Sequence, residues 1–154
     1  MSYINPITDR TYIDVLSGRE KGFFNISDWA RIANNIRIMH AEVKRIHGAA
    51  VPPLSEMMDM TTGSIPTAED FRGLVGNIER LRIAAGFLNP SGSGIFYEFS
   101  AGGKSFGFDE VNEWEKTIDR IYRRYAQLTI VRYERAGLAR CSAGMTRGNR
   151  FRGV

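Results

Sequence analysis

The segment NISDWARIANNIRIMHAEVKRIHG, residues 25–48, contains the clearest structural signal in the chain. Its apolar residues recur at steps of three and four, which places them on one face of an α-helix; they are Trp29, Ile32, Ala33, Ile36, Met39, Val43 and Ile46. Asn25 or Ser27 is suited to cap the start of this helix, and Gly48 is suited to end it. The helix needs a partner surface, because burial of this face stabilises it far more than helix propensity does.

A second amphipathic segment follows Thr67, which has the spacing of a capping box with Asp70. Its apolar residues again share one helical face; they are Phe71, Leu74, Val75, Ile78, Leu81 and Ala85. The pattern predicts a helix from Thr67 to about Gly86. Gly73 and Gly76 lie inside it, and because glycine weakens a helix they indicate the close approach of another backbone.

A third amphipathic segment begins at Phe108, and its apolar positions continue to Leu128. Acidic residues occupy its first turns, where the helix dipole favours negative charge. Thr8 marks the start of a shorter helix that ends at a glycine. The proline-containing residues 48–66 predict a long packed connection, and the pattern of residues 95–106 admits a small β-hairpin.

The chain is expected to form one core, because 154 residues are near the common size of a single domain. The patterns together predict a mainly α fold, a small bundle of three to four helices. Charged residues are distributed unevenly along the chain: residues 1–128 carry 15 basic and 16 acidic side chains, whereas residues 129–154 carry six arginines and one glutamate. We therefore expect a helical body over residues 1–128 and a basic arm over residues 129–154, which has too little apolar periodicity to pack on its own.

The arm supplies the candidate site residues, which we expect to bind a partner; they are Arg132, Arg135, Arg140, Arg147, Arg150, Phe151 and Arg152. Arginines in such a segment are compatible with three interpretations: a solvated surface, docking on an acidic or carbonyl-rich subunit, and contact with nucleic acid. Few aromatic residues accompany them, which disfavours stacking on single-stranded nucleic acid. We expect protein partners, and a small nucleic-acid-binding or packaging protein is the alternative.

No enzymatic constellation and no cofactor site is recognisable in the sequence. The segment AGGKS, residues 101–105, resembles the end of a phosphate-binding loop, but Glu98 occupies the position of its first glycine. His40 and His47 are roughly 10 Å apart along one predicted helix, too far to share a metal ion. Cys141 is the only cysteine, so no internal disulfide forms. We expect a protein that is not an enzyme and needs no metal or cofactor.

Several short motifs follow one another along the N-terminal part of the chain: Asp9-Arg10-Thr11, Asp14-Val15, Lys21-Gly22, Phe24-Asn25, Ser27-Asp28, Arg31-Ile32 and Asn35-Ile36. This series resembles a pattern in an uncharacterised family of tail-region structural proteins from phages and prophages of Gram-positive bacteria. Those proteins commonly combine Asp-Arg-Thr with a later Gly-Ala-Tyr-Asn-x-Thr-Asp-Leu-Asn-Arg-Val, where this chain has Trp29 and Ala30 in place of the usual Leu and Asn.

The resemblance implies a virion component of the tail region with no enzymatic role, such as a baseplate, adaptor or fibre-attachment protein. Its partners would be copies of itself, in a homo-oligomer, and other virion tail proteins. The sequence agrees with assembly in a host cytoplasm, since it has no signal-peptide pattern and no apolar run near the roughly 20 residues of a membrane span.

Overall fold

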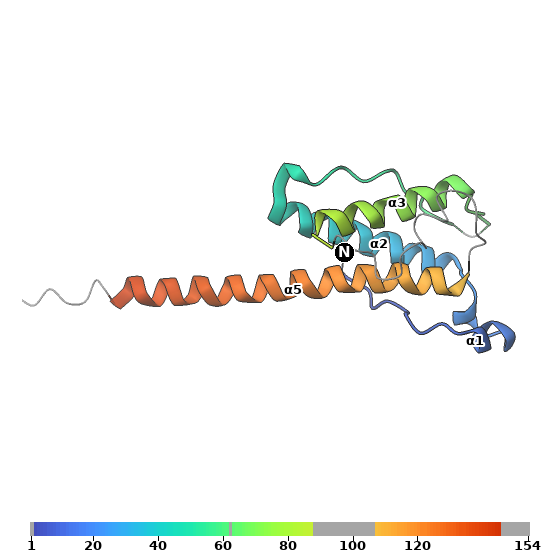
Figure 1. The fold of residues 1–154 in the computed structure, drawn as a ribbon, viewed down its shortest axis with the longest axis horizontal. Helices are drawn as coiled ribbons and strands as arrows, with labels where there is room; N and C mark the ends of the chain where they lie inside the picture. Colours follow the sequence, from blue (N-terminus) through green and yellow to red (C-terminus); the bar gives the residue numbers. More distant parts are fainter. Residues whose placement is uncertain (1, 62, 88–106, 146–154) are drawn as a thin grey trace, which may run out of the picture. The chain divides into compact units, whose positions relative to one another are not determined.

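The computed structural model describes residues 2–61, 63–87 and 107–145, with the side chains of the last range up to Leu128. These residues form four α-helices and no strand, which confirms the predicted mainly α fold (Figure 1). The helices are α1 (Tyr12–Leu16), α2 (Ile26–His47), α3 (Ala68–Ala84) and α5 (Phe108–Met145), with the 3-10 turns η1 (Glu20–Gly22) after α1 and η2 (Gly48–Ala50) after α2. The hairpin expected within residues 95–106 lies outside the described residues.

Helices α1, α2 and α3 each begin with a capping box. The cap side chain accepts the N–H of the third helical residue, whose carboxylate in turn accepts the N–H of the cap. For α2 the cap is Asn25 with Asp28, and for α3 it is Thr67 with Asp70. The caps predicted at Asn25 and Thr67 are therefore confirmed.

The start predicted for the first helix at Thr8 is wrong. Thr11 caps α1, which begins at Tyr12. The physical reason lies just before the helix, where the N–H and C=O of Arg10 are hydrogen-bonded to the side chain of Asn112 instead of to a helical neighbour.

Helices α2 and α3 and the first turns of α5 run in the same direction. Trp29, Phe71 and Trp114 lie near the starts of these three helices, and their rings meet with centroid distances of 5.4 Å for Trp29 to Phe71 and 6.4 Å for Phe71 to Trp114. The connection from α2 to α3 returns along α2, where Nε1 of Trp29 donates to the carbonyl oxygen of Met58 at 2.9 Å. Parallel neighbours require connections of this length, whereas short loops produce antiparallel ones.

The apolar core lies among these helices and includes both tryptophans. The face predicted for α2 is buried at every position except Ile46, which is half-buried. The other large apolar side chains of the core are Ile32, Ile36, Met39, Val43, Val51, Met57, Leu74, Val75, Ile78, Leu81, Val111, Ile118, Ile121 and Tyr125. The sequence pattern therefore identified the buried side of α2, of α3 and of the first turns of α5, whereas Leu128 at the end of the predicted α5 face is 41% exposed.

Helix α5 is longer than its apolar pattern predicts. It continues past Leu128 to Met145, so residues 129–145 of the expected arm are helical. The chain divides into two compact units, Met1–Tyr122 and Arg123–Val154, and α5 contributes residues to both. The functional division at residue 128 stays a prediction.

The close backbone approach predicted at Gly73 and Gly76 is absent from both positions. A Cβ atom at Gly73 would meet the carbonyl oxygen of Glu56 at an ordinary 3.6 Å, and one at Gly76 would meet no atom of the described residues within 4 Å. The close approach occurs at Gly22, where a Cβ atom would lie 2.6 Å from the carbonyl carbon of Asp14. The absence of a side chain at Gly22 therefore lets η1 pack against α1.

We expect Gly22→Ala to lower the free energy of unfolding by about 1 to 3 kcal/mol, because the added methyl group overlaps the backbone of α1. Gly76→Ala is the matched control, and we expect it to stabilise the protein by about 0.5 to 1 kcal/mol, since alanine is the better helix former and has open space there. Urea denaturation followed by circular dichroism measures both. A Gly22→Ala midpoint equal to that of the wild type would contradict the close contact.

Candidate functional site

Five large apolar side chains are exposed on α1, on the segment that follows it and at the first residue of α2. They are Tyr12, Ile13, Leu16, Phe23 and Ile26, with exposed fractions from 38 to 68%. Leu16 lies four positions after Tyr12 and three after Ile13, so it shares one side of the helix with both. We call these five residues the α1 face. A group of exposed apolar side chains of this kind is typical of an interaction site.

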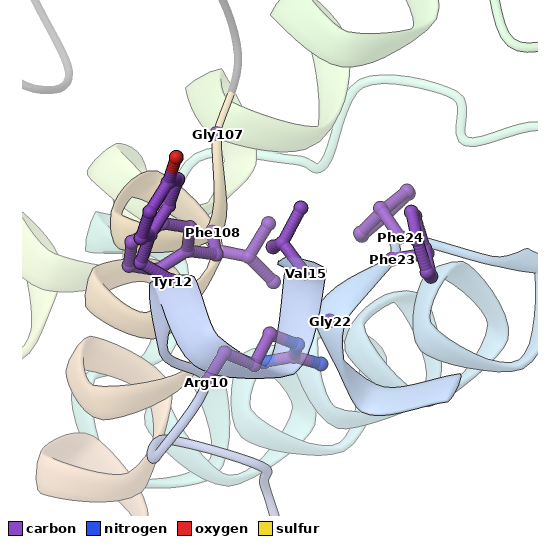
Figure 2. A pocket seen from close by; sticks show the side chains of 9 residues that line it. Arg10, Tyr12, Val15, Gly22, Phe23, Phe24, Gly107 and Phe108 are labelled. Atoms are coloured by element: carbon purple, nitrogen blue, oxygen red, sulfur yellow. The ribbon is translucent and has the colours of Figure 1, made fainter. Parts of the chain in front are cut away.

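A pocket of about 330 Å³ lies beside the α1 face (Figure 2). Tyr12 and Phe108 line one side of it, Phe23 and Phe24 line the other, and Val15 lies between the two pairs. A shallower hollow continues past Phe23 along the start of α2. The pocket is within the size range of binding pockets, and its aromatic walls suit an apolar group.

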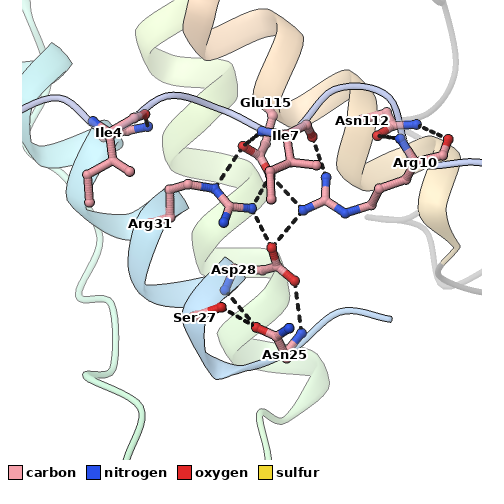
Figure 3. A network of polar contacts seen from close by, with 10 residues as sticks. Ile4, Ile7, Arg10, Asn25, Ser27, Asp28, Arg31, Asn112 and Glu115 are labelled. Atoms are coloured by element: carbon pink, nitrogen blue, oxygen red, sulfur yellow. Dashed lines mark hydrogen bonds and ion pairs between the residues drawn. The ribbon is translucent and has the colours of Figure 1, made fainter. Parts of the chain in front are cut away.

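Arg10 also borders this pocket, and its guanidinium belongs to a buried network centred on Glu115 (Figure 3). Oε1 of Glu115 accepts hydrogen bonds from Nη2 of Arg10 at 2.9 Å and from Nη2 of Arg31 at 2.7 Å. Oε2 accepts from Nε of Arg31 at 3.1 Å and from the backbone N–H of Ile7 at 2.7 Å. One carboxylate on α5 therefore joins α2 to the N-terminal segment.

Asp28 supplies the second carboxylate of the network. Its Oδ1 accepts from Nη2 of Arg10 at 2.7 Å and also from Arg31, while its Oδ2 accepts the N–H of Asn25 in the capping box of α2. Two positive and two negative side chains balance, and each is at most 10% exposed. Burial lowers the pKa of Arg31, but the hydrogen bonds to Glu115 and Asp28 outweigh it and hold the pKa above its ordinary value. Removing one member would leave an uncompensated buried charge.

Residues 2–10 form an extended strap that asparagine side chains hold in place (Figure 3). Asn35 on α2 donates to the carbonyl oxygen of Ile4 at 2.7 Å and accepts the N–H of the same residue at 2.9 Å. Asn112 on α5 forms the same pair of bonds with Arg10, at 2.8 and 3.2 Å. Each amide therefore satisfies an extended backbone as a neighbouring β-strand would.

Asp14 holds α1 to the turn that follows it. The hydroxyl of Thr11 donates to Oδ2 of Asp14 at 2.7 Å, and this hydrogen bond holds the pKa of Asp14 at about 2, below its ordinary 3.8. Burial opposes the change, while the N–H of Thr11 and the charges of Arg19 and Lys21 support it. Asp14 is therefore ionised throughout the neutral range and attracts both cations.

The described residues contain no group of three or more His, Cys, Asp or Glu side chains that could hold a metal ion. His40 is instead placed by a contact of 2.9 Å between its Nε2 and the carbonyl oxygen of Pro52. None of the helices in the described ranges combines the length and the apolar character that crossing a membrane requires.

The predicted partner-binding residues fall in the C-terminal part of the chain. Three of them are on the described part of α5, namely Arg132, Arg135 and Arg140. Four lie outside the described residues, namely Arg147, Arg150, Phe151 and Arg152. Their role stays a prediction.

Sequence reasoning did not identify the buried network. A local signal existed for Asp28, which is three residues after the cap Asn25 and so completes a capping box. A second signal existed for Glu115, which lies four residues after Val111 and three before Ile118 and therefore on the buried side of the predicted helix. No spacing rule connects either residue to Arg10.

No family model matches the chain, and no curated protein and no solved structure matches it either. The resemblance to phage tail-region proteins therefore stays a prediction. The function has to be inferred from the chain's own residues, chiefly from the α1 face, the buried network and helix α5.

We expect Glu115→Gln to lower the free energy of unfolding by about 3 to 5 kcal/mol, because two buried arginines would then share one carboxylate. Glu113→Gln is the matched control on the same helix. Glu113 forms only a partly exposed pair with Lys116 at 3.1 Å, so a loss below about 0.5 kcal/mol is expected. Urea denaturation of both variants measures the difference, and equal losses would contradict the central role of Glu115.

The low pKa of Asp14 predicts a defined pH dependence. Because this pKa is lower in the folded state, the carboxylate stabilises the protein above pH 3.8, and this contribution is lost as the pH falls toward about 2. Thr11→Val removes the main hydrogen bond and shifts the loss to higher pH, whereas Thr11→Ser keeps it. Unfolding free energies measured against pH, each compared with the corresponding Asp14→Asn protein, test this. Identical curves for the Val and Ser variants would rule out the Thr11 hydroxyl as the cause.

Proposed function

We propose that this chain is a non-enzymatic structural subunit of a bacteriophage tail or of a phage-tail-like particle, in a baseplate, adaptor or fibre-attachment role. It would act by packing against copies of itself and against other tail proteins. Assembly in the host cytoplasm and a final location in the virion are parts of the same proposal.

The observation that carries the proposal is the division of helix α5 between two units. Its first turns belong to the body, where Trp114 and Glu115 are buried. Residues 123–145 continue the same helix and carry five arginines and one glutamate. A charged helical extension that belongs to a separate unit is suited to reach a neighbouring subunit.

The interior of the body supports a structural role. The four charges of the network neutralise one another, and the strap closes over the helices through side-chain amides of the body itself. These buried polar groups are therefore committed to holding the fold together. The α1 face, which is exposed, provides a surface through which such a body can contact other proteins.

The resemblance of the N-terminal motifs to phage tail-region proteins gains a physical explanation from the same residues. Arg10, Asp28 and Arg31 all belong to the buried network, and Asn35 holds the strap. The shared motifs therefore mark the residues that build this fold, and they say nothing of a reaction.

We expect the full chain to form a discrete oligomer, or to join one when tail proteins are added, and a chain without residues 134–154 to remain monomeric with its body folded. Size-exclusion chromatography with light scattering at low and moderate salt measures this. A chain with Arg132, Arg135 and Arg140 changed to glutamine is the control that separates the charge of the arm from its length.

Two outcomes would contradict the proposal. A full chain that stays monomeric and elutes with nucleic acid in a salt-dependent way would favour a nucleic-acid-binding or packaging role instead. A large loss of thermal stability in the truncated chain would show that the arm is part of the body.

A further inference from the structure

The surroundings of the α1 face are acidic. Residues 9–26 and 107–113 together carry six acidic and three basic side chains, a net charge of −3. Arg10 is buried in the network, and Arg19 and Lys21 are paired with Asp14. Glu20 and Asp109 are exposed and form no ion pair within the described part of the chain. The face thus combines apolar side chains with uncompensated negative charge at its edge.

The C-terminal part of α5 has the complementary character. Residues 123–145 carry a net charge of +4, from five arginines and one glutamate. Leu128, Val131, Leu138 and Met145 are three and seven positions apart, so they fall on one side of the helix. Arg135 falls on the same side, between Leu128 and Val131. Residues 128–145 alone carry three arginines and one glutamate, so this part of the helix is basic, with a net charge of +2.

We propose that residues 128–145 of α5 from a second copy of the chain dock on the α1 face. The pocket between Tyr12 and Phe23 provides an apolar contact area for this helix, and the negative charges of Glu20 and Asp109 complement its net positive charge. This inference rests on the proposed function, since it assigns the surface that the arm of a neighbouring subunit contacts.

The physical chemistry of the two surfaces supports this pairing over contact between two arms. Two basic helices repel each other, whereas a basic helix and an acidic face attract. An apolar side chain in an aromatic pocket, surrounded by charged residues, is the usual arrangement of an interface centre and its rim. The contact joins two different surfaces, so it is heterologous and builds a ring or a filament instead of a closed dimer.

The test uses two sets of variants of the full chain. Leu16→Lys with Phe23→Lys disrupts the α1 face, and Ile83→Lys is the control, since Ile83 is 53% exposed on α3 and Phe23 is 50% exposed. Glu20→Lys with Asp109→Lys reverses the charge at the edge and leaves the apolar residues in place. Light scattering gives the mass of each, and thermal unfolding shows whether each is folded.

We expect the face variant to be folded and monomeric, the Ile83 control to assemble like the wild type, and the charge-reversed variant to need at least about tenfold higher concentration to assemble. The sharpest result comes from mixing. The face variant still has an arm, and the chain without residues 134–154 still has a face. Their mixture should therefore form a 1:1 complex that grows no further, because the arm of the first chain can bind the face of the second but no other intact pair of arm and face remains.

Assembly of the face variant like the wild type would overturn the inference, while loss of assembly in the truncated chain alone would leave the proposed function standing. A face variant that loses thermal stability as a monomer would also overturn it, because the face would then be covered within its own chain. A full chain that never assembles would remove both the inference and the proposed function.

Discussion

The bidentate pair between Glu115 and Arg31 is the interaction on which the rest of the body depends. It connects α5 to α2 through two hydrogen bonds, and the same carboxylate also accepts from Arg10 and from the backbone of Ile7. Charges this deeply buried are stable only when every one has its partner. The network therefore tolerates few alternative arrangements, and it fixes the strap, α2 and α5 in one register.

The parallel direction of the long helices places a second demand on the chain. The connection from α2 to α3 returns along α2, and an asparagine amide satisfies part of its backbone. Asn77 on α3 donates to the carbonyl oxygen of Ser55 at 3.0 Å and accepts its N–H at 2.8 Å, as Asn35 does with the strap. The parallel direction also brings the positive ends of the helix dipoles together, and acidic residues occupy the first turn of each helix.

The proposed role follows from the contrast between this interior and the rest of the molecule. Inside the body, the four charged side chains of the network are paired, and asparagine side chains bind the backbone of the strap. Along α5, acidic residues lie at the start, from Asp109 to Glu115, and arginines predominate from Arg120 onward. Within one chain, this distribution of charge agrees with the helix dipole. Between chains, it favours contact between the acidic start of one α5 helix and the basic part of another.

The sequence by itself determined the mainly α fold, the starts of α2 and α3 and the buried side of α2, of α3 and of the first turns of α5, because capping and helical periodicity are local properties of neighbouring residues. It also indicated a basic C-terminal segment from composition alone. The start of α1 was misplaced at Thr8, because the preceding residues pair with a side chain about a hundred positions away in the sequence.

Only the tertiary structure decided that Arg10, Asp28, Arg31 and Glu115 form one network, that Gly22 is the close contact, and that an aromatic pocket lies beside the α1 face. The physical reason is the same in each case. These features arise between residues that are distant in the chain, so their energies depend on how whole elements pack, and no local spacing in the sequence encodes that packing.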